Sequence, residues 1–205
     1  MKTITPVFPC LVYEDETQDF DLIKDRTIEY AYNQERRYPE SNKKSNYGGW
    51  QTPNPKFFTG DEEFQFFIDW FGYRIKEYLE YLDYDKDKKY GIEVTSFWFN
   101  INRRFDFNIS HHHPNSNLAG VLWIKTPKDS GTLVFDSPHE FVESNTMYLQ
   151  KQNLIDRYLA WERFAVEPKE GNMIIFPSHL RHSVTKNLST EDRISLAFNL
   201  TVDVG

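Results

Sequence analysis

The feature that most constrains the fold is a series of short apolar segments in the C-terminal half, each bounded by turn-forming residues. About eight such segments, rich in Val, Ile, Phe and Trp, follow residue 90. They read EVTSFWFNI, DFNISHHH, AGVLWIK, GTLVFD, RFAVEP, GNMIIFP, RHSVT and RISLAFNLTV. The long intervening helices that a parallel sheet would need are missing. The pattern predicts a mainly β fold with flanking helices, built as two packed antiparallel sheets or a small barrel.

Two helices are expected before these strands. Residues 19–36 place Phe20, Ile23, Ile28 and Ala31 at helical spacing after an acidic start. Residues 61–82 carry one apolar stripe, formed by Phe64, Phe67, Ile68, Phe71, Ile75, Tyr78, Leu79 and Leu82. This stripe indicates a packing face rather than a cofactor-binding face, because an amphipathic helix needs a partner surface.

Two further segments are less regular. Pro, Gly, Asn and Ser are dense between the helices, which predicts a long loop. A polar, weakly helical insert at residues 144–163 separates two of the predicted strands. Thr59 or Asp61 is placed to cap the start of the second helix.

Length and composition limit the organisation and the partners. At 205 residues we expect a single domain, 1–205, with a helical N-terminal part at about 1–90 and a β core at about 91–205. The net charge of -7, without a basic block, makes nucleic acid an improbable partner. Cys10 is the only cysteine, so one chain can form neither a disulfide framework nor a thiolate zinc site.

The N-terminus lacks the apolar run of a secretory signal, and no stretch reaches the roughly 20 apolar residues that span a bilayer. We therefore expect a soluble, cytoplasmic protein without a membrane partner. The oligomeric state stays open, a homodimer included.

Half of the six histidines stand together in the segment NISHHHPN. On an extended strand, His111 and His113 point to one face and His112 points to the other. His182 follows the apolar segment MIIFP, so three imidazoles could meet across neighbouring strands. Imidazole suits iron, copper, zinc or nickel. From spacing alone, a solvated histidine run at a sheet edge is an equally good interpretation.

Arg193 and Ser195 share one face of the strand RISLAFNL. A guanidinium offers a planar fork for a carboxylate, and a hydroxyl two positions along could add a hydrogen bond to the same group. An exposed arginine on an edge strand is the alternative.

Taken together, these residues resemble the iron(II) and 2-oxoglutarate dependent oxygenases. The resemblance is carried by SNYGGWQTP, FWFNINRRFDFNISHHHPNS, AGVLWIKTP, GTLVFDSP, VEPKEGNMIIFPSHLRHSV and RISLAFNL, in this order, and it covers most of the chain from about Ser45. More narrowly, the chain is similar to a bacterial and phage group with the pattern HxHP, FPSxLxHxV and RISxxFN. The resemblance implies a double-stranded β-helix, that is, a cupin-like jelly roll.

The resemblance also implies roles for residues. His111, His113 and His182 would ligate iron(II), and Arg193 with Ser195 would bind the distal carboxylate of the co-substrate 2-oxoglutarate. Leu122 and Trp123 stand where the narrower group tends to have Tyr-Tyr, so they would reshape the co-substrate pocket. Asn100 and Asn102 alternate with apolar residues on their strand and could hydrogen-bond the co-substrate or a metal-bound water, although solvent-facing sheet residues are an equally good interpretation. His112 and His179 are expected at the surface or beside the ligands.

The first histidine pair departs from the wider superfamily, which usually has Asp or Glu where this chain has His113. Three neutral ligands would leave the charge of the metal uncompensated. Asp136, in VFDSP, is the nearest alternative carboxylate ligand, and a structural aspartate at a strand end is the favoured interpretation of it.

The activity that the resemblance implies is a dioxygenase that hydroxylates a small molecule or a protein side chain and releases succinate and carbon dioxide. The loop YGGWQTPNP and the insert at 144–164 are candidate walls of the substrate cleft. Two alternatives remain open. One is a non-catalytic cupin-like module, metal-binding or structural, and the other is a three-histidine dioxygenase that does not use 2-oxoglutarate.

Overall fold

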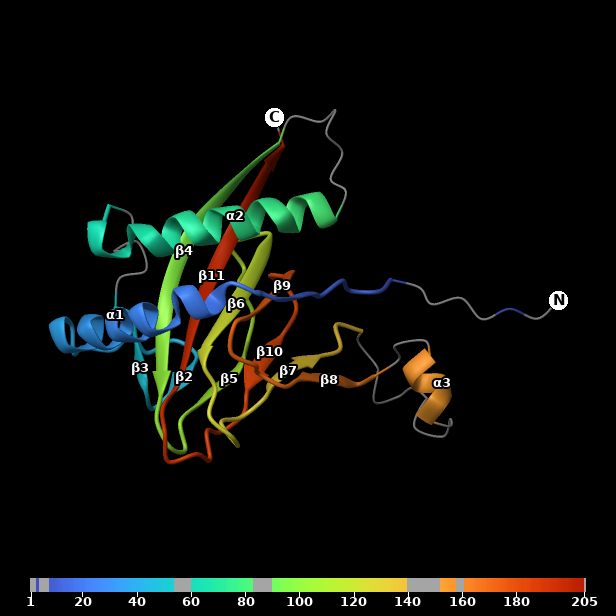
Figure 1. Ribbon diagram of the computed structural model, residues 1–205. Coiled ribbons are helices and arrows are strands. Elements are labelled where there is room, and N and C mark those ends of the chain that lie inside the picture. The colour runs from blue at the N-terminus through green and yellow to red at the C-terminus, as the bar shows by residue number, and fades with distance from the viewer. Residues whose placement is uncertain are drawn as a thin grey trace.

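Two antiparallel sheets form the centre of the molecule, as seen in a computed structural model that describes residues 3, 8–53, 60–82, 90–139, 152–157 and 161–204. The first sheet has the order β1-β9-β6-β11-β4-β3, and the second has the order β2-β5-β10-β7-β8 (Figure 1). All pairings between neighbouring strands are antiparallel. The mainly β architecture with flanking helices is therefore confirmed, and it has the form of a double-stranded β-helix.

The strand bounds follow the sequence closely. In the first sheet they are β1 (Tyr13–Glu16), β3 (Trp50–Gln51), β4 (Tyr90–Asn102), β6 (Leu118–Lys125), β9 (Asn172–Pro177) and β11 (Arg193–Val204). In the second they are β2 (Asn46–Tyr47), β5 (Phe107–His111), β7 (Leu133–Asp136), β8 (Arg163–Val166) and β10 (His182–Val184). All eight predicted strands are present, whereas β1, β2 and β3 were not expected.

The longest pairing joins β4 to β11 and sets the register of the first sheet. Arg193 lies opposite Asn102 and Ser195 lies opposite Asn100. On its other side β11 pairs with β6, which places Trp123 beside Ser195. Because side chains alternate along a strand, these polar residues share the face that looks toward the second sheet.

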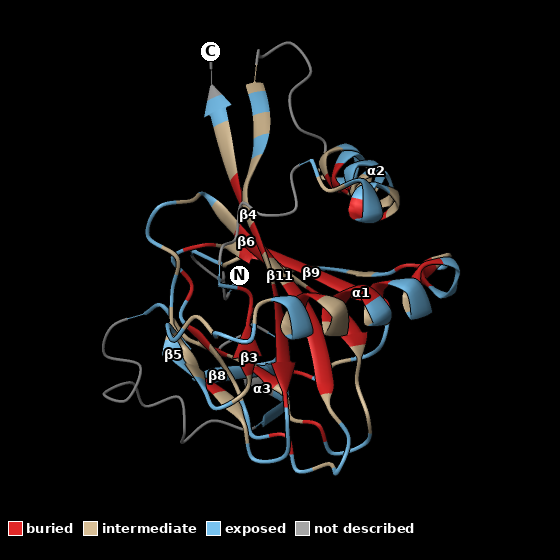
Figure 2. Ribbon diagram, turned by 90° about the vertical axis from the view of Figure 1, so that its left-hand side faces the viewer, coloured by how far each residue is buried: buried red, intermediate tan, exposed pale blue. Residues whose placement is uncertain are grey.

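The opposite face of the first sheet packs against α1 (Lys24–Arg37) and α2 (Gln65–Tyr81), which lie across it (Figure 1). The even-numbered residues of β11 belong to this core, namely Ile194, Leu196, Phe198 and Leu200. Figure 2 shows the buried residues concentrated in the sheet beneath the two helices. The helices thus cover one face of the sheet and leave the other face for the site.

Both predicted helices are present, but α1 begins five residues after the predicted start at Asp19 and α2 begins four residues after Asp61. A short 3-10 turn, Phe20–Leu22, precedes α1, and another, Glu62–Phe64, precedes α2. Asp61 caps this second turn, because its side chain accepts a hydrogen bond from the backbone N–H of Glu63. The predicted stripe is a packing face, as expected: Phe64, Phe67, Phe71, Ile75 and Tyr78 are all buried in the aromatic core.

A second, smaller core lies between the sheets. Its members come from the face opposite the helices and include Trp123, Leu133, Phe135, Ile174 and Phe176. Strand β9 contributes to both cores, since Met173 and Ile175 belong to the first. This explains why its sequence is apolar throughout rather than alternating.

Strands from before residue 90 join both sheets, so the N-terminal part is not only helical. Of the insert at 144–163, the structure describes α3 (Gln152–Arg157) and residues 161–163, and the remainder lies outside the described residues. Residues 54–59 of the predicted loop, Thr59 among them, also lie outside the described residues.

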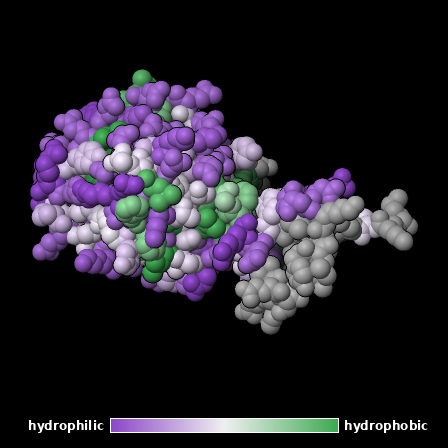
Figure 3. Space-filling view, turned by 90° about the horizontal axis from the view of Figure 1, so that it is seen from below, coloured by the Kyte–Doolittle hydropathy of each residue, from purple (hydrophilic) through white to green (hydrophobic). Residues whose placement is uncertain are grey.

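No helix in the described part of the chain is long and apolar enough to cross a membrane. The face seen from below Figure 1 is mostly hydrophilic, with some hydrophobic groups among the polar ones (Figure 3).

Candidate metal and co-substrate site

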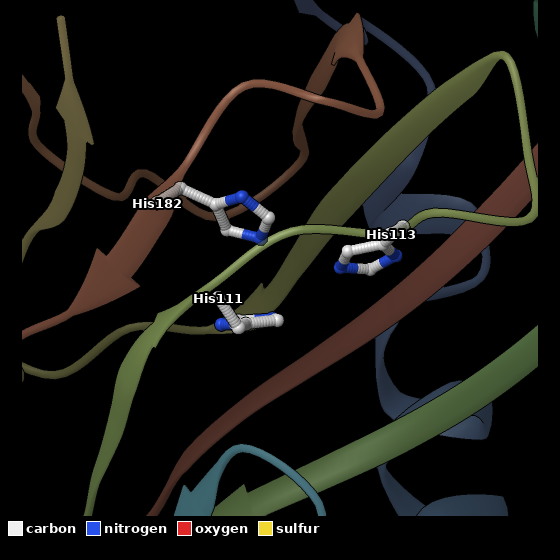
Figure 4. Close-up of side chains that lie close together, drawn as sticks. All are labelled: His111, His113 and His182. Carbon is white, nitrogen blue, oxygen red and sulfur yellow. The ribbon is translucent and has the colours of Figure 1, made fainter. Parts of the chain in front are cut away.

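Three histidines meet between the two sheets. His111 ends β5 and lies opposite His182, the first residue of β10, while His113 follows β5 two residues later. The rings of His111 and His182 are 4.3 Å apart between centroids, and each lies 5.2 Å from the ring of His113. One nitrogen from each residue lies within 4.8 Å of the others. Figure 4 shows the three rings around a common space.

Hydrogen bonds select the same tautomer for two of these rings. Nδ1 of His111 lies 2.8 Å from the carbonyl oxygen of Ile109, and Nδ1 of His182 lies 2.9 Å from that of Leu180. A carbonyl oxygen only accepts, so each Nδ1 carries the proton. Each Nε2 then keeps a lone pair that can bind a metal.

The third ring is held by a side chain. Nδ1 of His113 lies 2.5 Å from Oδ1 of Asn199, and Nδ2 of Asn199 donates to Oγ of Ser96 at 3.0 Å. The contact with Ser96 orients the amide so that its oxygen faces His113. Nε2 of His113 is buried and has no hydrogen-bond partner in the described part of the chain. A buried lone pair without a partner is consistent with a ligand for a cation.

Burial keeps the three imidazoles neutral. It lowers the pKa of His182 to about 3 and that of His113 to about 4, and it lowers the pKa of His111 as well. Neighbouring histidines add to the shift of His182, because two imidazolium ions would repel each other. At neutral pH all three therefore present the form that binds metals.

No carboxylate of the described residues joins this group. Asp136 is engaged elsewhere: its Oδ1 accepts from Nε of Arg163 at 3.2 Å, and its Oδ2 accepts from Oγ of Ser110 at 2.9 Å. Three neutral nitrogen donors suit iron(II) and other transition metals rather than magnesium or calcium. Iron(II) therefore fits the three histidines, and Asp136 is not positioned to complete the set.

Arg193 lies at the start of β11 and is 1% exposed. Its Nη1 donates to the carbonyl oxygens of Ser130 and Thr185, the second at 3.1 Å. Gly131 allows this close packing, because a Cβ there would lie 2.6 Å from Nη1. The alternative of an exposed arginine on an edge strand is thus excluded.

The rest of the guanidinium lacks partners. Nε and Nη2 of Arg193 are buried and donate to no acceptor among the described residues. Burial lowers the pKa of Arg193 to about 10, so the group stays charged at neutral pH. A buried guanidinium whose Nε and Nη2 have no acceptor is suited to bind the carboxylate of another molecule.

Other unpartnered polar atoms lie in the same two rows of the sheet. They are Nε1 of Trp123 and Oδ1 of Asn100, in the row of Ser195, and Nδ2 of Asn102, in the row of Arg193. A cavity of about 50 Å³ is lined by the three histidines at one end and by Ser195, Asn100 and Trp123. Arg193 does not line this cavity, but it lies two residues before Ser195 on the same face of β11, so a keto acid bound to a cation at the histidines would extend toward its two unpartnered donors.

The remaining predicted residues fall into two groups. His112 and His179 are exposed, as expected. Leu122 is fully buried in the core beneath the helices, so it cannot shape the pocket together with Trp123. Consecutive strand residues face opposite sides, and only Trp123 faces inward.

Asn199 was missed in the sequence, although a signal was present. It continues the alternation that begins with Arg193 and Ser195, two residues at a time, and so lies on the same face. What the sequence does not give is that His113 would reach this position, because that depends on how the two sheets pack.

Comparison with known proteins adds a family to this geometry. Residues 96–199 match the sequence profile of the family described as "Putative 2OG-Fe(II) oxygenase". The chain belongs to this family. The matched segment contains all three histidines, Arg193 and Asn199.

Solved structures show the same fold at low sequence identity. A prolyl-4-hydroxylase from Pseudomonas putida matches with a TM-score of 0.58 and 14% identity, over 92% of this chain and 91% of that one. A viral collagen prolyl hydroxylase from Paramecium Bursaria Chlorella virus-1 matches with a TM-score of 0.55 and 16% identity, over 92% and 94% of the two chains. A search of curated protein sequences gave no significant match.

Proposed function

We propose that the protein is an iron(II) and 2-oxoglutarate dependent dioxygenase that hydroxylates a substrate and releases succinate and carbon dioxide. The observation that carries the proposal is a cluster of three neutral histidines around one interior cavity, together with the buried, partly unpartnered guanidinium of Arg193, which lies two residues before the cavity-lining Ser195 on the same face of β11. Family membership supports it.

In this proposal each residue has a limited task. His111, His113 and His182 hold the metal as neutral donors, and Asn199 keeps the ring of His113 in its binding tautomer. Arg193 binds the distal carboxylate of 2-oxoglutarate through Nε and Nη2, with Ser195 beside it. Bound iron(II) and 2-oxoglutarate supply the oxidant on reaction with dioxygen, while the protein orients the reactants and excludes water.

The buried Arg193 favours this proposal over a three-histidine dioxygenase that needs no keto acid. Such an enzyme would not need a buried arginine whose Nε and Nη2 have no hydrogen-bond partner among the described residues. It would, however, share the absence of a carboxylate ligand among the described residues. The two functions therefore differ in what Arg193 does.

The test is to add iron(II) and then 2-oxoglutarate without oxygen, record metal content and visible absorption, and then admit oxygen and measure succinate. We expect both ligands to bind and succinate to form. His182→Ala should lose the metal, whereas Arg193→Ala should keep it and need far more 2-oxoglutarate. Arg104→Ala removes an exposed arginine and serves as the matched control.

Each alternative has its own outcome. Turnover that is indifferent to 2-oxoglutarate and to Arg193→Ala would identify the three-histidine dioxygenase. Absence of both 2-oxoglutarate binding and succinate formation, with or without bound iron(II), would indicate the non-catalytic module. Full retention of metal by His182→Ala would remove His182 from the ligand set.

A further inference from the structure

A second and larger hollow lies next to the candidate metal site. It has a volume of about 390 Å³ and shares His111, His113 and Trp98 with the smaller cavity. We call it the outer groove. Because both spaces contact the same two histidines, a molecule in the outer groove would lie beside a metal held by them.

The charge of the outer groove differs from that of the whole chain. The chain carries 31 acidic and 24 basic residues, yet no Asp or Glu is found among the described residues that line the groove, and Lys44 is the one formally charged residue among them. The other lining groups are neutral amides, hydroxyls, imidazoles and apolar side chains. The described lining of the groove is therefore less acidic than the chain as a whole.

Lys44 is exposed, and no ion pair found among the described residues involves it. It lines the same hollow as His111 and His113. The lysine therefore places an uncompensated positive charge near the three histidines. A long, solvated side chain of this kind can bind a carboxylate or a phosphate as a point charge.

A divalent cation bound by the three histidines would add positive charge at the inner end of the outer groove. Three neutral imidazoles contribute nothing that offsets the charge of a divalent cation, whereas a carboxylate ligand would offset part of it. Asp136, which lies on the strand next to that of His182, is paired with Arg163 and is not part of the groove lining. The neutral ligand set and the groove lining are independent features, and both favour a negatively charged molecule in the outer groove.

We propose that the outer groove binds an anionic substrate, one that carries a carboxylate or a phosphate group, and that Lys44 is the residue that binds this group. The inference rests on the proposed function, since the groove is a substrate site only if the three histidines hold a reactive metal. It adds a substrate class to that function and a specificity role to Lys44.

The test uses three probes of similar size: 4-fluorobenzoate, 4-fluorophenyl phosphate and the neutral 4-fluorobenzamide. The full chain is loaded with cobalt(II) and saturated with 2-oxoglutarate, so that Arg193 is occupied. Broadening of the fluorine resonance by the paramagnetic metal then reports a probe in the groove. We expect at least one anionic probe to bind about five- to tenfold more tightly than the amide, as one close charge pair near a surface allows.

Lys44→Glu should abolish this preference. Lys43→Glu is the matched control, because Lys43 is also exposed and changes the net charge equally but does not line the groove. The relative affinities of the benzoate and the phosphate distinguish the two kinds of anion. Equal binding of all three probes, or equal loss in both variants, would overturn the inference.

Failure of the proposed function remains distinguishable. Binding of cobalt(II) and 2-oxoglutarate is measured first, from visible absorption. If neither binds, probe binding to the metal-free Lys44→Glu and Lys43→Glu variants is compared by saturation-transfer NMR. A preference that depends on Lys44 would then support an anion-binding groove without the oxygenase, and no such dependence would refute both.

Discussion

Replacing Arg193 with Met should separate the stability of the protein from its response to 2-oxoglutarate. The substitution removes a buried charge that has two unpartnered nitrogens, which is favourable, and it also removes the hydrogen bonds from Nη1 to two carbonyl oxygens. Hydrogen bonds to charged groups contribute about 1.5–3 kcal/mol each. Burying an unpaired charge costs a similar amount, several kcal/mol. The two changes oppose each other, so we expect the free energy of unfolding without ligand to stay within about 2 kcal/mol of wild type.

In the presence of 2-oxoglutarate, the expected difference in stability between wild type and Arg193→Met is larger. At a 2-oxoglutarate concentration of 100 times Kd, wild type gains about 2.7 kcal/mol of stability. Loss of two charge-assisted hydrogen bonds, about 3–6 kcal/mol in all, weakens binding by about a hundredfold or more. The same concentration then stabilises Arg193→Met by less than about 0.5 kcal/mol.

The assay is denaturant unfolding of the manganese(II)-loaded protein without oxygen, with and without 2-oxoglutarate. Arg104→Met is the control, since Arg104 is exposed and should leave both values unchanged. If Arg193→Met kept the full gain from 2-oxoglutarate, the carboxylate would be bound elsewhere and our interpretation of the idle guanidinium edge would be wrong.

Three further predictions concern pH, the ligand set and packing. Burial holds the pKa of His113 and His182 below 6.5, so between pH 6.5 and about 4 the unfolded chain binds more protons than the folded one, and the free energy of unfolding of the metal-free protein falls as pH drops. Replacing both histidines with Gln should flatten this slope by up to about 2.7 kcal/mol per pH unit in urea titrations; an unchanged slope would argue against neutral buried rings. Asp136→Asn should bind iron(II) with wild-type stoichiometry in a metal assay, and loss of the metal would restore Asp136 as a ligand. Gly120→Ala should lower the free energy of unfolding by about 1–3 kcal/mol, because its Cβ would lie 2.2 Å from the ring of Phe198. Gly72→Ala, on an exposed face of α2 with no atom within 4 Å of the new Cβ, should instead raise it by about 0.5–1 kcal/mol.

The regular elements could be predicted because each has a local signal. The eight strands of the β core are apolar segments between turns, and the stripe from Phe64 to Tyr78 has helical spacing. Strand β1 has no such signal: its sequence is YEDE, and it is a strand because it pairs with β9. Strands β2 and β3 are two residues long, which is too short for any periodicity.

Of the site, the sequence predicts only which residues of the same strand share a face. Alternation places His111 with His113 and Arg193 with Ser195, and it also rules out a shared role for Leu122 and Trp123. That His182 lies opposite His111 depends on the pairing of β5 with β10, which local sequence does not encode. The burial of Arg193 likewise depends on packing between the sheets.

Strand β11 carries both ends of the site on one face, with Arg193 at its start and Asn199, the partner of His113, six residues later. Six residues of extended chain span roughly 20 Å, and this length cannot adjust, because the intervening side chains of the opposite face are fixed in the core under α1 and α2. Homologues of the keto acid that are one methylene shorter or longer would have to misplace either the chelating end or the distal carboxylate. We therefore expect oxaloacetate and 2-oxoadipate to be poor replacements for 2-oxoglutarate, and single-residue insertions in β11 to be far more damaging than insertions in the surrounding loops.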